Sequence, residues 1–314
     1  MQSSAATSRQ INGIVTALVT PLTEEGTLDK AGLEHLIERQ IAAGVDALFV
    51  LGSVGEGPLV RDEVFRATAE HAAYCTRGRV PILGGASGNS LDRCVSKMQV
   101  FAEHGYTAVV ATLPYYGWPG RHDDSLRFFT LLAGRSPLPL VAYNLPKAVG
   151  WQMPPETLEA LFTVNNLICI KDTHGDEARM RAIAGSPRRP AHFSYLPGNS
   201  ALTWRLLEAG ADGVVSTPAN LFPEPFVDLL RFHREGRTDL AQALDREVMP
   251  QVIALLDLMP TGASALKGLL ALEGVCCSST VAPWPAMDAA AQDAARPKLE
   301  AARAAITAFR LSHS

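Results

Sequence analysis

A lysine at the end of an apolar run is the residue of this sequence best suited to covalent chemistry. Lys171 follows the run 167–170, which is short and rich in β-branched residues and therefore predicts a buried strand. Burial lowers the pKa of an amine, and a neutral amine is a nucleophile toward a carbonyl carbon. Strand alternation predicts that Leu167, Cys169, Lys171 and Thr173 share one face. The alternative is a structural lysine that reaches solvent at a strand end or pairs with an acid.

A glycine-rich turn offers donors for a carboxylate. The segment 52–57, Gly-Ser-Val-Gly-Glu-Gly, has its glycines spaced G-x-x-G-x-G, and no acidic residue follows at the position that would contact a ribose. It therefore does not match a dinucleotide-binding loop. We interpret it as a carboxylate cradle formed by the backbone N–H groups of Ser53 and Val54 together with the Ser53 hydroxyl. An ordinary glycine turn is the alternative.

Tyrosines follow two further apolar runs. Tyr143 lies at a predicted strand end, where it is either a core aromatic with a solvated hydroxyl or a carrier of protons to and from substrate. Tyr115 and Tyr116 are ambiguous in the same way, because an aromatic pair in a loop is often an interface element.

Other catalytic classes find little support. The histidines at 71, 104, 122, 174 and 192 are scattered without ligand spacing at the strand ends, and no G-x-S-x-G motif occurs. The sequence predicts no metal site and no cofactor.

Composition limits the partners. With 314 residues, 47% hydrophobic and 19% charged, the chain fits either two domains or one large α/β barrel. A net charge of −4 and a pI near 6.1 predict neither nucleic-acid nor membrane binding. Five cysteines without a C-x-x-C pair predict reduced thiols in a cytoplasmic protein, and adjacent Cys276 and Cys277 rarely form a relaxed disulfide. Residues 1–10 are predicted to be a disordered tail without a signal sequence.

Short apolar runs alternate with amphipathic stretches along most of the chain. Eight strands are predicted, at 13–21, 46–52, 81–87, 108–114, 138–146, 167–173, 192–198 and 213–220. The intervening helices are predicted at 28–43, 61–76, 90–104, 122–133, 154–163, 176–185, 199–209 and 222–235, with helix starts capped by Thr27, by Asn89 or Ser90, and by Asn199 or Ser200.

This alternation predicts a (β/α)8 TIM barrel over residues 11–235. The remaining residues, 236–314, are predicted to form a helical appendage on the barrel, with helices near 237–257, 263–272 and 287–311. In such a barrel the chemistry lies at the carboxyl ends of the strands. A lysine, tyrosines and a serine therefore converge on one mouth.

Together, these motifs resemble the N-acetylneuraminate lyase and dihydrodipicolinate synthase family of class I, Schiff-base aldolases. The resemblance covers about residues 11–300. It depends on Gly-Ser-Val-Gly-Glu at 52–56, Leu-Pro-Tyr-Tyr at 113–116, Tyr-Asn-Leu-Pro at 143–146, Ile-Lys-Asp-Thr at 170–173 and Gly-Val-Val-Ser at 213–216.

The resemblance implies roles for individual residues. Lys171 would form the imine with pyruvate or another 2-oxo acid, and Tyr143 would be the general acid/base. Ser53 would link the tyrosines in a proton relay to which Tyr116 comes from a neighbouring subunit. The Ser53 and Val54 N–H groups would bind the carboxylate, and Thr173 would contact substrate hydroxyls. Gly198 and Val215 would line the pocket through their carbonyls. A homo-oligomer, usually a tetramer, and no metal or other cofactor are also implied.

Departures from the family pattern bear on the substrate. Val54 stands where a second hydroxyl residue is usual, and Lys147 and Ala148 stand where the synthases have serine and a carboxylate-binding arginine. Thr173 is similar to the sugar-acid lyase branch. We therefore expect a lyase or aldolase that acts on a 2-oxo-3-deoxy sugar acid, with pyruvate and an aldehyde as its partners. The alternatives are a 4-hydroxy-tetrahydrodipicolinate synthase that condenses pyruvate with aspartate semialdehyde, a dehydratase of the same family, and a non-catalytic 2-oxo acid sensor.

Overall fold

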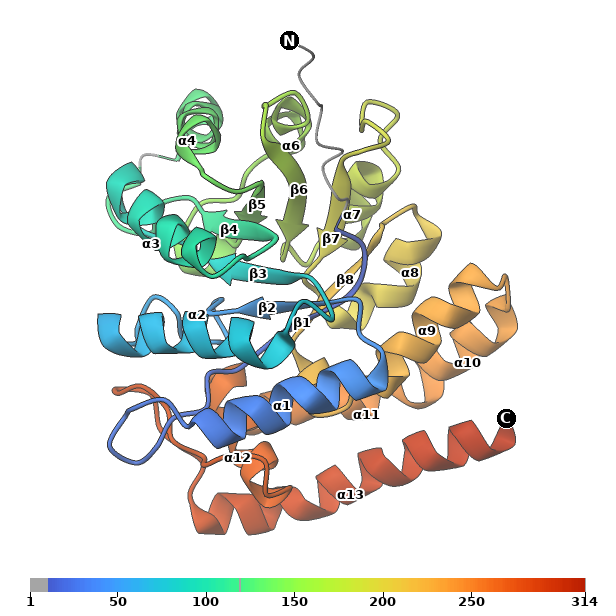
Figure 1. Ribbon diagram of the computed structural model, residues 1–314. Helices are drawn as coiled ribbons and strands as arrows, with labels where there is room; N and C mark the ends of the chain where they lie inside the picture. The colour runs from blue at the N-terminus through green and yellow to red at the C-terminus, as the bar shows by residue number, and fades with distance from the viewer. Residues whose placement is uncertain (1–10, 119, 314) are drawn as a thin grey trace.

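Eight parallel strands form the centre of the protein (Figure 1). The computed structural model describes residues 11–118 and 120–313, so the predicted tail 1–10 lies outside the described part. All eight strands fall within their predicted ranges: β1 Gly13–Ala17, β2 Ala47–Val50, β3 Ile82–Gly85, β4 Ala108–Thr112, β5 Leu140–Asn144, β6 Leu167–Asp172, β7 Ser194–Pro197 and β8 Gly213–Ser216.

The strands are arranged as a nearly closed barrel. Their order is β7-β6-β5-β4-β3-β2-β1-β8, and β7 packs beside β8 at the seam. There the Asp212 N–H donates to the Tyr195 carbonyl at 3.1 Å, and the Tyr195 N–H donates to the Asp212 carboxylate at 2.8 Å. The predicted (β/α)8 barrel is confirmed.

Helices alternate with the strands and cover the outside of the barrel. They are α1 Lys30–Ala43, α2 Asp62–Thr76, α3 Leu91–Glu103, α4 His122–Arg135, α5 Pro146–Val149, α6 Pro155–Leu161, α7 Glu177–Ala184, α8 Thr203–Glu208 and α9 Glu224–Arg234, with 3-10 turns at Ser200–Leu202 and Pro218–Asn220. Ser90 and Asn199 cap their helices as predicted. The prediction of Thr27 as a cap was wrong, because the Asp29 carboxylate accepts the Gly32 N–H of α1.

The expectation that Leu167 shares one face of strand β6 with Cys169 and Lys171 was also wrong. A register shift occurs opposite Leu140 and Val141, which pair with Leu167 and Cys169. The extra residue is Ile168, and such a bulge reverses the alternation. Leu167 therefore packs in the outer core under the helices, whereas Ile168 and Cys169 face the barrel interior.

The C-terminal region consists of helices packed on one side of the barrel. They are α10 Thr238–Glu247, α11 Met249–Ala254, the 3-10 helix Leu255–Leu258, α12 Gly262–Leu272 and α13 Ala289–Ser312. Figure 1 shows α13 at the lower side of the molecule, where it packs against α11 and α12, with the chain end at its far end. None of the described helices is by itself long and apolar enough to span a membrane; only the bent pair Thr238–Leu258 with Gly262–Leu272 meets that requirement, by length and composition.

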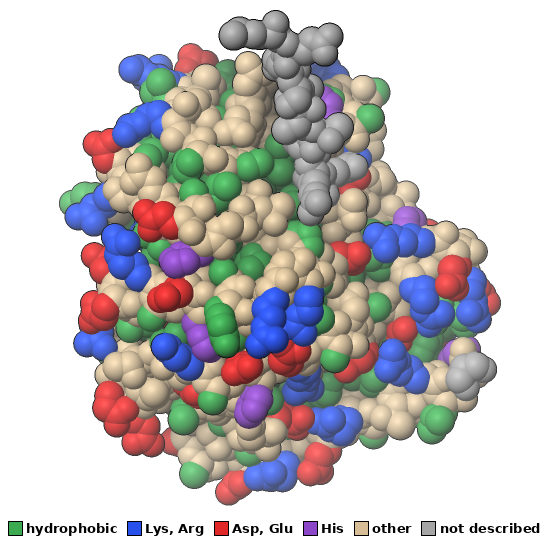
Figure 2. Space-filling model, viewed as in Figure 1, with side chains coloured by type: hydrophobic (Ala, Val, Ile, Leu, Met, Phe, Trp, Pro, Cys, Tyr) green, Lys and Arg blue, Asp and Glu red, His purple; other side chains and the backbone are tan. Residues whose placement is uncertain are grey.

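Basic and acidic side chains alternate on the face seen in Figure 2 and form no continuous area of one sign. This distribution agrees with the small net charge of −4. It gives no support for a nucleic-acid interface on this face.

Candidate active site

Lys171 is buried at the mouth end of β6, with 5% of its surface exposed. Its Nζ lies 4.0 Å from the ring centre of Tyr143 and 4.6 Å from that of Phe49. No carboxylate among the described residues forms an ion pair with it. Burial lowers the pKa of Lys171, and the Tyr143 phenol opposes part of that shift. The structure therefore contains the desolvated amine that nucleophilic attack requires.

Tyr143 and Thr173 lie beside this amine. Tyr143 of β5 pairs in register with Lys171 of β6. The Thr173 hydroxyl donates to the Tyr143 phenol oxygen at 3.2 Å. Two hydroxyl groups are thereby joined into a short path beside the Lys171 amine, which is the geometry that proton transfer needs.

The turn after β2 is held in an uncommon backbone conformation. Leu51 and Glu56 have φ values of 57° and 54°, in the left-handed region that L-residues rarely adopt. A Cβ at Gly57 would lie 1.9 Å from the Leu51 carbonyl oxygen, so only glycine fits there. Within the described part of the chain, the N–H groups of Ser53 and Val54 have no hydrogen-bond acceptor. These donors are available for a ligand carboxylate.

Six of the eight predicted site residues line one cavity of about 460 Å³. They are Ser53, Val54, Tyr143, Lys171, Thr173 and Gly198. The rest of the lining comes from strand ends and from the C-terminal region: Ala17, Glu56, Leu59, Leu145, Lys147, Thr217, Thr261, Gly262, Ala263 and Trp284.

Two predicted residues do not line the cavity. Val215 of β8 is buried in the barrel interior, with 3% exposed. Tyr116 is 83% exposed, and its N–H donates to the Asn89 side chain at 3.1 Å. Tyr115 instead lines an adjoining cavity of about 240 Å³, together with Ala148. A relay through Tyr116 requires a second subunit, and this role stays a prediction.

A buried network that the sequence analysis missed fixes the strand end that carries Lys171. The Asp172 carboxylate is fully buried and accepts from the Asn144 amide at 2.8 Å and from the Tyr195 hydroxyl at 2.9 Å. It also accepts the His174 N–H at 3.1 Å. Through these bonds Asp172 connects the strand end that carries Lys171 to β5, to β7 and to the backbone that follows it. In the sequence, the signal for this network was Asp172, a second charged residue directly after Lys171 in an otherwise apolar strand.

A buried ion pair links the glycine-rich turn to the C-terminal helices. The Lys267 ammonium, fully buried in α12, binds the Glu56 carboxylate. It also donates to the Ser279 carbonyl at 2.9 Å, and Glu56 accepts the Val281 N–H at 2.7 Å. Burial lowers the pKa of Lys267, while Glu56 opposes that shift. The lysine inside the otherwise apolar run 263–272 was the sequence signal for this pair.

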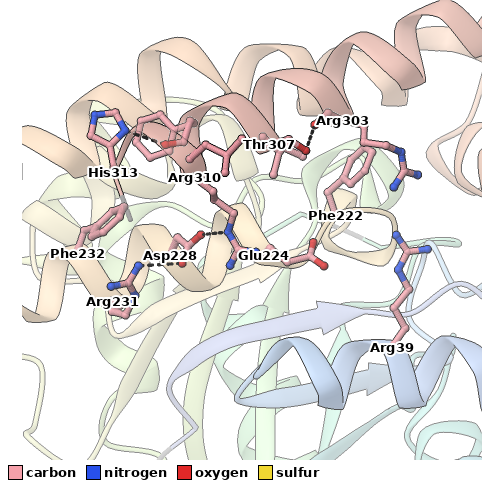
Figure 3. A pocket seen from close by; sticks show the side chains of 13 residues that line it. Arg39, Phe222, Glu224, Asp228, Arg231, Phe232, Arg303, Thr307, Arg310 and His313 are labelled. Carbon is pink, nitrogen blue, oxygen red and sulfur yellow. Dashed lines mark hydrogen bonds and ion pairs between the residues drawn. The ribbon is translucent and has the colours of Figure 1, made fainter.

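A larger groove, of about 580 Å³, lies between α9 and α13 (Figure 3). Its arginines are bound by acids of the fold: Arg310 binds Asp228 at 2.8 Å, Arg231 binds Asp228 at 3.1 Å, and Arg303 binds Glu273. Because these acids engage the arginines and no buried nucleophile lines the groove among the residues that the structure describes, the Lys171 cavity is the better candidate for the active site.

Comparisons with known proteins agree with the fold. The model of the dihydrodipicolinate synthetase family matches residues 10–302. A 4-hydroxy-tetrahydrodipicolinate synthase of Porphyromonas gingivalis is 31% identical over 266 residues, which cover 83% of this chain and 89% of that protein. The corresponding enzyme of Salinibacter ruber is 32% identical over 245 residues, covering 77% and 80%.

Solved structures are similar over almost the whole chain. YagE, a prophage protein of E. coli K12 in complex with pyruvate, has a TM-score of 0.87 at 28% identity, covering 93% of this chain and 99% of that one. The 4-hydroxy-tetrahydrodipicolinate synthase of Methylacidiphilum fumariolicum has a TM-score of 0.88 at 27% identity, covering 96% and 99%.

Fold and relatives together define the class, which is a lyase of the aldolase type on a (β/α)8 barrel. The chain belongs to the dihydrodipicolinate synthetase family.

Proposed function

We propose that this protein is a pyruvate-dependent aldolase that reversibly cleaves a 2-oxo-3-deoxy sugar acid through an imine on Lys171. The observation that carries the proposal is the buried Lys171 amine beside the hydrogen-bonded pair Tyr143 and Thr173. An amine with a lowered pKa next to a hydroxyl relay is suited to attack a ketone and to move the protons that follow.

The reaction balances with groups of this chain alone. The neutral Lys171 amine adds to the keto carbon, and the ammonium so formed passes a proton to the new oxygen. Tyr143 then donates its phenolic proton to that hydroxyl, which leaves as water and gives a protonated imine and a Tyr143 phenolate. The imine accepts the electron pair of the breaking carbon–carbon bond while the phenolate takes the proton of the substrate hydroxyl, so that the aldehyde, the enamine and the Tyr143 phenol form. The enamine is then protonated, and water releases pyruvate and regenerates the amine.

The remaining contacts orient the substrate in this proposal. The Ser53 and Val54 N–H groups hold the carboxylate next to the keto carbon, with the Ser53 hydroxyl beside them. Thr173 contacts a substrate hydroxyl, and the Gly198 carbonyl faces the imine end, whereas the role implied for the Val215 carbonyl stays a prediction because Val215 does not line the cavity. No metal or other cofactor takes part.

The outer part of the cavity favours a sugar acid over aspartate semialdehyde. Ala148 lines the adjoining cavity and has no side chain that could bind a carboxylate. Lys147 lines the Lys171 cavity and is exposed, but an ammonium lacks the paired donors of a guanidinium. Thr217 and Thr261, which also line the cavity, offer hydroxyl oxygens suited to a polyhydroxylated substrate.

A second candidate is a 4-hydroxy-tetrahydrodipicolinate synthase, because the relatives at 31% and 32% identity carry that name. In this case Lys147 binds the second carboxylate. The proposal also includes a homo-oligomer in which Tyr116 reaches the cavity of a neighbouring subunit, and the 83% exposure of Tyr116 supports this arrangement. A cytoplasmic location completes the proposal.

The test has two stages. Wild type and Lys171→Met are first incubated with pyruvate and borohydride, and peptide mass analysis then looks for a reduced pyruvyl adduct on the Lys171 peptide. We expect the adduct in the wild type only, and its absence there would overturn the imine mechanism.

The second stage compares substrates. We expect pyruvate release from 2-oxo-3-deoxygluconate to have a larger kcat/KM than condensation of pyruvate with aspartate semialdehyde. Faster condensation, improved further by Ala148→Arg, would favour the synthase instead. Consumption of the sugar acid without release of an aldehyde would identify a dehydratase.

A further inference from the structure

A glutamate, a histidine and a cysteine meet on the outside of the barrel, between α1 and α2. Glu34 comes from α1, and His71 and Cys75 come from α2. One ligand atom of each lies within 4.8 Å of the ligand atoms of the other two. None of the three lines the Lys171 cavity.

The helix geometry explains the convergence. His71 and Cys75 are four residues apart on α2, so their side chains lie one above the other on the same face. That face packs against α1, the neighbouring helix in Figure 1, from which Glu34 approaches. The sequence search for closely spaced ligands missed this set because one ligand lies on a different helix.

The histidine is held in the state that a metal ligand requires. His71 Nε2 lies 3.1 Å from the Lys30 carbonyl oxygen. A carbonyl only accepts, so Nε2 carries the proton and Nδ1 keeps its lone pair. Histidines that bind zinc usually donate their other ring N–H to a carboxylate, a water or a backbone carbonyl of this kind.

Two charged residues close to the cluster, Glu38 and Arg79, are paired with each other. Glu38, one turn after Glu34, accepts from both terminal nitrogens of Arg79, with Nη1 at 2.8 Å. Arg79 also donates to the Cys75 carbonyl at 2.7 Å. Arg79 therefore ties α1 to α2 beside the cluster, and Glu34 has no ion-pair partner within residues 11–118 and 120–313.

Exposure across the cluster gives a route from solvent. Glu34 is exposed, His71 is half-buried, and Cys75 is buried with 2% exposed. A cation can arrive through the exposed carboxylate and reach the thiol at the base.

We propose that Glu34, His71 and Cys75 form a Zn²⁺ site that clamps α1 to α2. Thiolate, imidazole and carboxylate are the donors that zinc prefers, with water as the fourth ligand of a tetrahedron. Ligand atoms around a tetrahedral zinc stand about 3.3–3.6 Å apart. The ligand atoms of the three side chains already lie within 4.8 Å of one another, and zinc binding would bring them to that spacing. Binding displaces the thiol proton to solvent, so the charge of the site balances.

The test uses the full-length protein with Zn²⁺, and Co²⁺ as a spectroscopic substitute. We expect one equivalent of metal per chain, a rise in Tm with Zn²⁺, and a thiolate-to-Co²⁺ charge-transfer band in the near ultraviolet. Glu34→Gln, on an exposed position, and His71→Gln should each weaken the apparent Kd by at least about tenfold. Cys75→Ser should remove the charge-transfer band.

Cys277→Ser is the matched control, because Cys277 is an exposed thiol outside the cluster. It should leave the Zn²⁺ affinity and the Co²⁺ band unchanged. Loss of binding in Cys277→Ser, or unchanged binding in Glu34→Gln and Cys75→Ser, would overturn the site. Borohydride trapping of pyruvate on Lys171 should be equal in all these variants, so the result is independent of the proposed catalytic function.

Discussion

Gly198 and Thr173 share one space at the mouth of the barrel. A Cβ placed on Gly198 would lie 2.3 Å from the Thr173 hydroxyl oxygen and 3.3 Å from Lys171 Cε. The absence of a side chain at position 198 is therefore what allows Thr173 to donate to Tyr143. The glycine belongs to the site through packing, in addition to any role of its carbonyl.

This relationship predicts the effect of Gly198→Ala. The methyl group displaces the Thr173 hydroxyl from Tyr143, and kcat/KM should fall roughly 10- to 100-fold, since small misplacements of catalytic groups have effects of that size. Steady-state kinetics measure the loss. Thr173→Ser, which keeps the hydroxyl, should lose much less. Unchanged kcat/KM in Gly198→Ala would show that the contact with Tyr143 has no part in turnover.

Lys171→Met should stabilise the protein at neutral pH. Burial lowers the pKa of Lys171 in the folded state, so between that pKa and the unfolded value of about 10.4 the unfolded chain binds more protons. Stability of the wild type therefore rises with pH across this window. We expect the Tm of Lys171→Met to exceed that of the wild type by about 2 °C or more at pH 7. The difference should shrink as the pH approaches 10, and a difference that grows with pH would contradict this sign.

The Glu56 and Lys267 pair predicts strong coupling between two distant segments. Lys267→Met leaves a buried carboxylate unpaired and should lower the free energy of unfolding by about 3–5 kcal/mol. The double variant Glu56→Gln with Lys267→Met should recover a large part of that loss, because no unpaired charge remains. Urea unfolding of the two single variants and the double variant gives the coupling energy. Additive losses would mean that the pair is not coupled.

Local patterns were sufficient to predict the strands and six of the residues that line the cavity. Each strand has its own apolar run, and Ser53, Tyr143 and Lys171 each stand at the end of one, so the barrel rule was enough to bring them together. The bulge at Ile168 was not predictable in this way, because it depends on how β6 pairs with β5.

Contacts between distant segments account for what was missed. Glu56 and Lys267 are 211 positions apart, and the C-terminal residues Thr261 and Trp284 line the cavity without any motif of their own. Their positions follow from the packing of α12 against the barrel. The cap of α1 was missed for a different, local reason: the helix starts at Lys30, directly after Asp29, and not at residue 28 after Thr27.

Tyr195→Phe tests whether the Asp172 network positions the nucleophile. The fully buried Tyr195 hydroxyl donates to Asp172 at 2.9 Å, and the carboxylate that it helps to fix is adjacent to Lys171. Removal of the hydroxyl should lower the free energy of unfolding by about 1–3 kcal/mol, since a buried carboxylate loses one donor. If the network orients the strand end, the rate of borohydride trapping with saturating pyruvate should also fall, by about tenfold.

Phe193, a buried neighbour without a hydroxyl, offers the control: Phe193→Leu should lower stability and leave the trapping rate unchanged. Equal trapping rates in wild type and Tyr195→Phe would restrict the network to a role in stability.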